Sequence, residues 1–324
     1  MHFCTLFIVI YVFFCNIVFC EERLGVVVWH GMGKSFVLCP ITLLSSLFLF
    51  YYYIGDSGEG GGIQHLCTMI KNEIPGVYVL NLMIGSSTVM DRVNSFFMPI
   101  NEQLDLVCKK IHSDPRLANG FHLIGFSQGG LFVRALAQRC PPKKLGSVIS
   151  IGGPQEGIYG LPFCPNATAV PLCRYLRTLL SQTAYNDLVQ SSFVQAQYWH
   201  DPMNEEVYRL KSRFLSEINQ ENTVNKTYRE NLLKAENLVL VRFMSDRTVI
   251  PSISEWFGFY HNGSSEATYD YKESKQYTTD CLGLRTLDRQ GRLHLLSLPG
   301  RHLQFSDDWF RKIIIRKFLN ITIY

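Results

Sequence analysis

Charged residues are scarce in this sequence. They make up only 18% of its 324 residues, and the net charge of +4 is spread without a basic run. A nucleic-acid-binding surface needs clustered lysine and arginine, so that class is excluded and a soluble protein mildly attracted to acidic surfaces is indicated. No cysteines and histidines stand at the spacing of a zinc site, so we expect no metal and no cofactor. Internal repeats, low-complexity tracts and a domain linker are also lacking, which favours a single domain.

Hydrophobic residues, in contrast, are plentiful, at 47%. This content argues against disorder, and the chain is long enough to bury a substantial core. The start is the most apolar part, since residues 3–19 are almost wholly apolar. We interpret residues 1–20 as a secretory signal peptide, with the mature domain at 21–324; an uncleaved membrane anchor is the alternative. Four glycosylation sequons support export, at Asn166, Asn225, Asn262 and Asn320.

The stretch at residues 121–130 organises the rest of the chain. A short apolar run turns at Gly125-x-Ser127-x-Gly129 and then becomes a helical pattern over residues 131–139. Strand, sharp turn and helix are typical of a nucleophile elbow, which holds a serine hydroxyl at the end of a strand. The glycines fit because strand and helix crowd this turn and leave no room for a Cβ. An ordinary glycine-containing turn is the alternative.

Apolar patterns around the elbow alternate between strand and helix. Strands are predicted at 24–29, 77–82, 145–151, 238–243 and 293–298, and helices at 64–73, 99–111 and from about Ser306 to 318. This alternation predicts an α/β fold, with a mainly parallel sheet and helices on both faces. Residues 155–236 break the rhythm with helical patterns at 174–180, 185–199, 205–218 and 227–237. We interpret them as a helical insertion over the C-terminal edge of the sheet, where ligands bind in such folds.

A serine nucleophile needs a base, and the base needs an orienting carboxylate. In α/β hydrolases these follow in the order Ser, Asp, His. Asp246 comes just past the strand at 238–243, and His302 lies between the last strand and the last helix. The sequence therefore predicts a triad of Ser127, Asp246 and His302, in which the serine attacks an acyl carbonyl and forms an acyl-enzyme.

Other candidates for the triad are weaker. His261 lies among turn residues with no strand leading into it, and His294 is inside a strand. Asp201 belongs to the helical insertion and is interpreted as a turn or cap residue.

Two further sets of residues are expected beside the nucleophile. The first strand ends in His30-Gly-Met-Gly33, so the backbone amides of Met32 and Gln128 are predicted to form the oxyanion hole. Amides aimed at the developing oxyanion are worth about 2.7–4 kcal/mol each in the transition state. An apolar acyl groove is the second expectation, although such residues are more often core. Its candidates are Phe126, Phe193, Tyr198, Trp199, Val249 and Ile250.

Residues 35–54 form a nearly charge-free run that is long enough to span a bilayer. A membrane helix here would keep the oxyanion loop and Ser127 apart, so we reject it, and a surface lid would expose a large apolar patch. We instead interpret residues 34–54 as the translation of a retained intron, because Gly33-Lys-Ser35 can be encoded by a splice-donor sequence. A spliced transcript that still encodes them would contradict this interpretation.

Several motifs together identify a family. The chain resembles the lysosomal palmitoyl-protein thioesterases over nearly its whole mature length, except that this family has no counterpart of residues 34–54. The chain also departs from the family at Gly58-Glu-Gly-Gly-Gly62, where family members carry an adjacent cysteine pair. The matching motifs are Val27-Val-Trp-His-Gly-Met-Gly33, Gly125-Phe-Ser-Gln-Gly-Gly130, Ala137-Gln-Arg-Cys-Pro141, Gly160-Leu-Pro162 with Cys164, Gln197-Tyr-Trp-His-Asp-Pro202, Ser254-Glu-Trp-Phe-Gly-Phe-Tyr260 and His302-Leu-Gln304.

This resemblance implies an enzyme that removes thioester-linked palmitate from S-acylated cysteines of proteins or peptides in lysosomal degradation. It implies the same triad, the disulfides Cys108–Cys140 and Cys164–Cys173, no stable transmembrane anchor, and a lysosomal or secreted location. Spacing alone does not establish disulfide connectivity. Two alternatives stay open: a lipase or carboxylesterase acting on oxygen esters, and a catalytically impaired binding protein if residues 34–54 are real.

Overall fold

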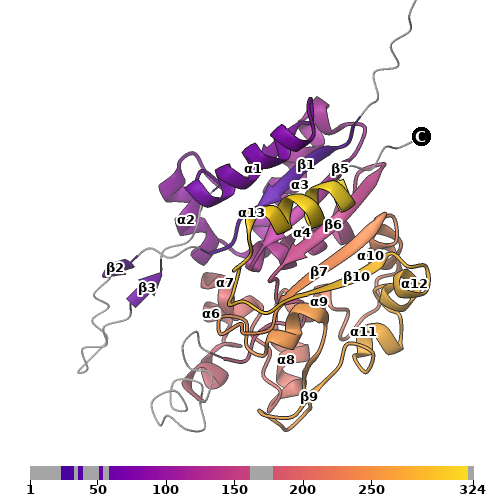
Figure 1. Cartoon of the computed structure of the whole chain (residues 1–324). Coiled ribbons are helices and arrows are strands. Elements are labelled where there is room, and N and C mark those ends of the chain that lie inside the picture. The colour runs from indigo at the N-terminus through magenta and orange to yellow at the C-terminus, as the bar shows by residue number, and fades with distance from the viewer. Residues whose placement is uncertain (1–22, 33–35, 39–50, 54–57, 161–177, 320–324) are drawn as a thin grey trace, which may run out of the picture.

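A six-stranded parallel sheet runs through the centre of the molecule (Figure 1). The computed structural model describes residues 23–32, 36–38, 51–53, 58–160 and 178–319. The strand order is β10-β7-β6-β5-β1-β4, and every neighbouring pair is parallel. The strands are β1 (Gly25–Trp29), β4 (Val79–Asn81), β5 (Phe121–Phe126), β6 (Leu145–Ile151), β7 (Asn237–Phe243) and β10 (Leu293–Leu298).

The sheet is buried on both faces. In β1, Val27 and Trp29 point into one hydrophobic cluster, and Val26 and Val28 point into the other. Successive side chains of a strand face opposite sides, so a strand that is covered twice must be apolar throughout. This requirement explains the continuous apolar runs of the sequence.

Helices cover the two faces (Figure 1). One face packs against α1 (Gly61–Glu73) and the C-terminal helix, which begins as α13 (Asp307–Trp309) and continues as the π-helical segment η3 (Phe310–Leu319). The other face packs against α3 (Ile100–Ser113), α4 (Gln128–Arg139) and α10 (Lys226–Leu232). The predicted strands and flanking helices are confirmed, although β4 is shorter and α4 begins three residues earlier than expected.

Helix α2 (Thr88–Phe97) was not predicted from the sequence. The Ser87 side chain caps its start by accepting a hydrogen bond from the Met90 amide at 3.2 Å. Its apolar residues Val89, Met90 and Phe97 are exposed rather than aligned on a buried face. The buried residues of this helix are polar instead, so its apolar side faces away from the core, unlike that of a core-facing helix.

The insertion at 155–236 is helical but more broken than predicted. The expected helix at 185–199 divides into α6 (Asp187–Ser192) and α7 (Val194–Gln197). Buried Gln190 explains the break, because its Nε2 donates to the carbonyl oxygens of Ala184 (2.7 Å) and Ala196 (2.6 Å). The expected helix at 205–218 likewise divides into α8 (Glu205–Lys211) and α9 (Leu215–Ile218), and residues 178–183 are helical.

The segment between β7 and β10, expected to be a long loop, contains short elements. Strand β8 (Phe259–Tyr260) leads directly into His261, which corrects the sequence interpretation of that histidine. Trp256 Nε1 donates to the Leu240 carbonyl at 2.9 Å and ties the segment to β7. The other elements are η2 (Ser252–Trp256), β9 (Thr268–Tyr269), α11 (Lys275–Thr278) and α12 (Leu284–Arg289), and η1 (Pro115–Leu117) precedes β5.

Within residues 34–54, the structure describes β2 (Phe36–Leu38) and β3 (Tyr51–Tyr53), an antiparallel pair separate from the central sheet. The rest of this segment and the predicted signal peptide lie outside the described residues. The retained-intron interpretation stays a hypothesis. In the part of the chain that the structure describes, no helix is long and apolar enough to cross a membrane.

Candidate active site

Ser127 stands at the turn between β5 and α4, with a backbone conformation of φ 53° and ψ −127°. Residues with a Cβ rarely adopt a positive φ, so the backbone at Ser127 is strained and the surrounding structure must hold it in place. A Cβ on Gly125 would collide with the Gly129 carbonyl, and one on Gly129 would lie 2.5 Å from the carbonyl oxygens of Trp29 and His30. Both glycines are therefore required by close backbone contact, as the sequence interpretation expected.

Three polar side chains from different parts of the chain meet at this turn. His302 Nε2 lies 2.9 Å from Ser127 Oγ, and His302 Nδ1 lies 2.5 Å from Asp246 Oδ2. Ser127 follows β5, Asp246 follows β7 and His302 follows β10, because parallel strands bring their carboxyl ends to one edge of the sheet. The Asp246 side chain is fully buried, and the His302 side chain is 16% exposed. The structure thus brings the predicted serine, histidine and aspartate into one hydrogen-bonded chain.

Asp246 is held as a carboxylate. Its Oδ1 accepts hydrogen bonds from the amides of Thr248 (2.6 Å) and Val249 (3.0 Å). Burial by itself raises the pKa of Asp246, but hydrogen bonds from His302, Glu255 and Thr248 outweigh it and hold the pKa below its ordinary value. An ionised Asp246 can keep a proton on His302 Nδ1 and leave Nε2 free to face the serine.

Glu255 is a neighbour of Asp246 that the sequence interpretation missed. It lies in η2, is 1% exposed, and its Oε2 accepts from the amide of Phe243 at 2.8 Å. Burial raises the pKa of Glu255 well above the ordinary range, and the neighbouring Asp246 adds to the effect. Glu255 belongs to the family motif at 254–260, but only the folded chain shows that it lies against Asp246.

The loop after β1 lies directly against the nucleophile. A Cβ on Gly31 would stand 2.7 Å from Ser127 Cβ and 2.9 Å from the Phe126 carbonyl oxygen. Met32 follows, and its Sδ accepts from Gln195 Nε2 at 2.6 Å. Gly31 therefore lies against the elbow, and the oxyanion-hole role of the next amide, that of Met32, stays a prediction.

Gln128 is the first residue of α4, where a helical amide has no acceptor within its own helix. Its side chain is held from two sides: Nε2 donates to the Ser95 carbonyl at 3.1 Å, and Tyr198 Oη lies 3.4 Å from its Oε1. These two contacts hold the Gln128 side chain, so that it does not bind the backbone amide of Gln128.

A serine, histidine and aspartate on this sheet edge can carry out acyl transfer, and comparison with known proteins narrows the class. The palmitoyl protein thioesterase family model matches residues 25–302. The chain belongs to this family. The resemblance that the motifs indicated is confirmed, and with it the predictions of a thioesterase and of the α/β-hydrolase fold.

Individual relatives agree with this assignment. Palmitoyl-protein thioesterase 1 of Caenorhabditis elegans is 40% identical and covers 92% of each chain. Palmitoyl-protein thioesterase 3 of Dictyostelium discoideum is 38% identical over 74% of this chain and 80% of its own, and the human lysosomal thioesterase PPT2 is 31% identical over 73% and 76%. Among solved structures, a monoacylglycerol lipase of Paleococcus ferrophilus covers 91% of this chain and 93% of its own, with 14% identity and a TM-score of 0.41.

The residues predicted for the acyl groove of this thioesterase do not all lie together. Phe126 belongs to the core cluster that includes the C-terminal helix and packs 6.3 Å from the rings of Phe305 and Phe310. Trp199 is in the other cluster, with its ring 5.4 Å from that of Tyr159. The Tyr159 amide donates to the Ile250 carbonyl at 2.7 Å, so Trp199 and Ile250 both contact Tyr159.

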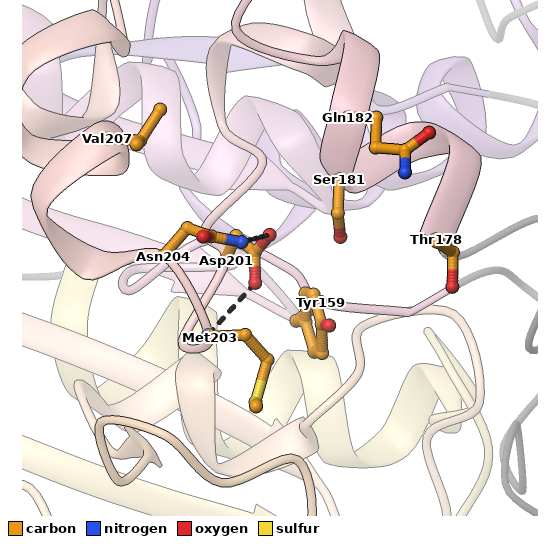
Figure 2. Close-up of a pocket in the computed structure, with 8 residues that line it drawn as sticks. All are labelled: Tyr159, Thr178, Ser181, Gln182, Asp201, Met203, Asn204 and Val207. Carbon is orange, nitrogen blue, oxygen red and sulfur yellow. Dashed lines mark hydrogen bonds between the residues drawn. The ribbon is translucent and has the colours of Figure 1, made fainter.

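Tyr159 also lines a pocket of about 410 Å³ between the helical residues 178–183 and the turn at Asp201 (Figure 2). Asp201 accepts hydrogen bonds there from the Met203 amide and Asn204 Nδ2, which makes it a turn residue as expected. None of the predicted acyl-groove residues lines this pocket. The lining residues are Tyr159, Thr178, Ser181, Gln182, Asp201, Met203, Asn204 and Val207.

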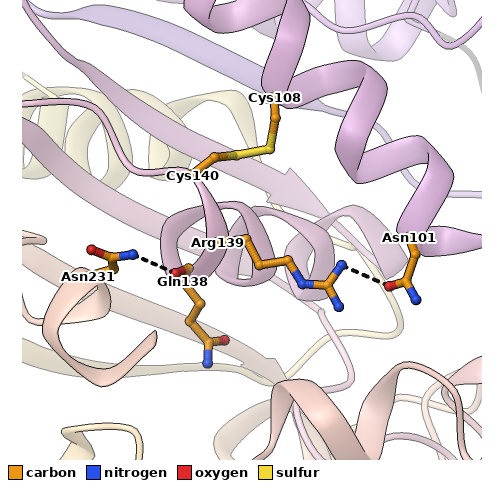
Figure 3. Close-up of a disulfide and its surroundings, with 6 residues drawn as sticks. All are labelled: Asn101, Cys108, Gln138, Arg139, Cys140 and Asn231. Carbon is orange, nitrogen blue, oxygen red and sulfur yellow. Dashed lines mark hydrogen bonds between the residues drawn. A yellow bond between two sulfur atoms is a disulfide. The ribbon is translucent and has the colours of Figure 1, made fainter. Parts of the chain in front are cut away.

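Cys108 of α3 and Cys140, at the end of α4, form the disulfide that the family resemblance implied (Figure 3). Beside it, Arg139 Nη1 donates to Asn101 Oδ1 at 2.8 Å, so the two helices are joined twice. Cys164 and Cys173 lie outside the described residues, as do the sequons at Asn166 and Asn320. The sequon residues Asn225 and Asn262 are exposed.

Proposed function

We propose that this thioesterase releases palmitate, or a similar long acyl chain, from S-acylated cysteines of proteins or peptides. The hydrogen-bonded chain from Ser127 through His302 to Asp246 carries the proposal, because it supplies the nucleophile and base that acyl transfer needs. The names of the relatives, which are palmitoyl-protein thioesterases, support the choice of acyl group.

The reaction proceeds through an acyl-enzyme. Ser127 Oγ attacks the thioester carbonyl while His302 Nε2 takes its proton, and Asp246 stabilises the imidazolium that forms. The amides of Met32 and Gln128 hold the oxyanion. The imidazolium then returns the proton to the leaving sulfur, and water releases the fatty acid by the same route.

The leaving group explains why this machinery suits thioesters. A thiol has a pKa of about 8.5, so its anion leaves with less help from a general acid than an alkoxide needs. The triad itself acts on either kind of ester. Specificity for a long chain must therefore come from apolar contacts, and we assign these to Trp199, Val249 and Ile250. All three are buried, and the Val249 amide binds Asp246 Oδ1.

We further propose a lysosomal location reached through the secretory pathway. The apolar start of the sequence and the exposed sequon residues Asn225 and Asn262 support export. Relatives from rat and human carry the name lysosomal thioesterase. Immunofluorescence of the tagged protein with a lysosomal marker tests the location.

A turnover assay with a palmitoylated cysteine peptide tests the reaction, using the full chain and a chain that lacks residues 34–54. We expect Ser127→Ala to lower turnover by at least about 10⁴-fold, whereas the exposed control Ser113→Ala should leave it unchanged. Turnover of a matched oxygen ester in the same assay distinguishes a thioesterase from the lipase alternative. Equal turnover of both esters would favour that alternative, and no turnover by either wild-type chain would contradict the proposal.

A further inference from the structure

Glu255 stands directly behind the catalytic aspartate. Oxygen atoms of Glu255 and Asp246 and a nitrogen of His302 all lie within 4.8 Å of one another. The amide that Glu255 Oε2 binds belongs to Phe243, the last residue of the strand that leads to Asp246. Glu255 is thus attached to the same strand end that presents the aspartate.

Two carboxylates at this distance cannot both be ionised in a buried site without strong repulsion. Burial raises the pKa of Glu255 most, and its hydrogen bond with Asp246 and the charge of Asp246 raise it further. The Phe243 amide and the charge of Arg242 act in the opposite direction but do not cancel these effects. Arg242 directs its Nη2 to Ser252 Oγ at 3.1 Å.

The second carboxyl oxygen of Glu255, Oε1, is the candidate site for a proton. Oε1 is buried, and no hydrogen-bond donor of the described chain reaches it. An ionised carboxylate would leave this oxygen unsatisfied, which is costly in a buried site. A protonated carboxyl instead has a donor of its own, and Asp246 lies within reach of Glu255. A hydrogen bond with Glu255 is among the contacts that lower the pKa of Asp246.

We propose that Glu255 remains protonated during catalysis and positions Asp246 by donating a hydrogen bond to its carboxylate. Glu255 touches no reacting atom in this role and acts through Asp246. The proposal rests on the proposed role of Asp246 in the triad. With Glu255 neutral, the two carboxyl groups together present one negative charge to His302, that of Asp246. The proton that His302 accepts from Ser127 can then be passed on to the leaving sulfur.

Glu255→Gln tests the charge state. Glutamine keeps the shape, accepts from the Phe243 amide and donates to Asp246, but carries no charge at any pH. We expect kcat/KM within about threefold of wild type and an acid limb of the pH profile that does not move. If Glu255 were ionised, removing a negative charge less than 5 Å from His302 would move that limb down by roughly two pH units, and this result would overturn the proposal.

Glu255→Leu tests the positioning role, since leucine fills the space but donates nothing. We expect kcat to fall about tenfold or more with little change in KM, while near-ultraviolet circular dichroism shows a folded protein. Wild-type kcat in this variant would refute the role of Glu255. Glu266→Gln, at an exposed glutamate, is the matched control and should change neither quantity.

A divalent cation is the other way to hold two carboxylates together. Activity that is lost on EDTA treatment and restored by zinc chloride would overturn the proposal, and we expect EDTA to have no effect. The pH midpoint of the His302 imidazole can also be followed by proton NMR in wild type and Glu255→Gln. This titration needs no substrate, so a chain without palmitoyl thioesterase activity would still test the charge of Glu255.

Discussion

Arg134 is a fully buried charge on α4, the helix that begins at the nucleophile. Its guanidinium donates to the side-chain oxygens of Gln155 (2.7 Å), Gln138 (2.9 Å) and Asn219 (2.6 Å). It also donates to the carbonyls of Gln155 (3.3 Å) and Ile218 (3.2 Å). Burial lowers the pKa of Arg134 to about 10, so it remains charged at neutral and acidic pH. Arg134 therefore ties the elbow helix α4 to the helical insertion at 155–236.

Arg134→Met removes these bonds but keeps an apolar stem of similar length. Three side-chain acceptors lose their donor, and each unsatisfied buried group costs about 1–3 kcal/mol, so after partial relaxation we expect a loss of about 3–5 kcal/mol. The entropy of unfolding is about 2.1 cal/mol/K per residue. Dividing the loss by this entropy for 324 residues gives a decrease in Tm of about 4–7 °C.

Thermal unfolding followed by circular dichroism measures the effect. Arg213→Met is the matched control, because Arg213 pairs with Asp187 at 2.9 Å while the two side chains are 46% and 83% exposed. Such a surface pair is worth less than about 1 kcal/mol, so its Tm should fall by about 1 °C. If both variants melted alike, the buried arginine network would contribute nothing and the reasoning would be refuted.

Three further predictions concern other parts of the structure. Replacing both Cys108 and Cys140 by alanine opens a loop with a sequence separation of 32, and should lower the free energy of unfolding in urea by about 3–4 kcal/mol. Burial raises the pKa of Glu156, so above about pH 4.3 an unfolded Glu156 releases a proton that the folded one keeps. The free energy of unfolding, measured by urea titration between pH 4 and 7, should therefore fall as pH rises, and less steeply in Glu156→Gln. Gly129→Ala places a Cβ 2.5 Å from the carbonyl oxygens of Trp29 and His30. It should cost about 1–3 kcal/mol of stability and most of the thioesterase activity, and wild-type values in both assays would contradict this account of the elbow.

The triad could be predicted because its members have simple positions along the chain. Ser127, Asp246 and His302 each follow a strand, and parallel strands collect their carboxyl ends at one edge whatever lies between them. The strands themselves could be recognised because burial on both faces demands apolar residues throughout.

Residues that act through contacts across the fold could not be predicted. Glu255 is nine positions past Asp246, and only the turn through η2 returns it to the aspartate. Gln190 divides a helix that periodicity predicts as continuous, because its amide binds the carbonyls of Ala184 and Ala196, one before the break and one after it. Phe126 was one of the groove candidates, yet the alternation of side chains along β5 sends it into the core.

The sequence by itself therefore determined the sheet, the elbow and the order of the catalytic residues, because these depend on local periodicity and backbone geometry. The tertiary structure alone decided the surroundings of Asp246, the buried arginine network and the walls near Tyr159. Their physical cause is the removal of polar groups from water, and which groups then become partners depends on distances that exist only after the chain has folded.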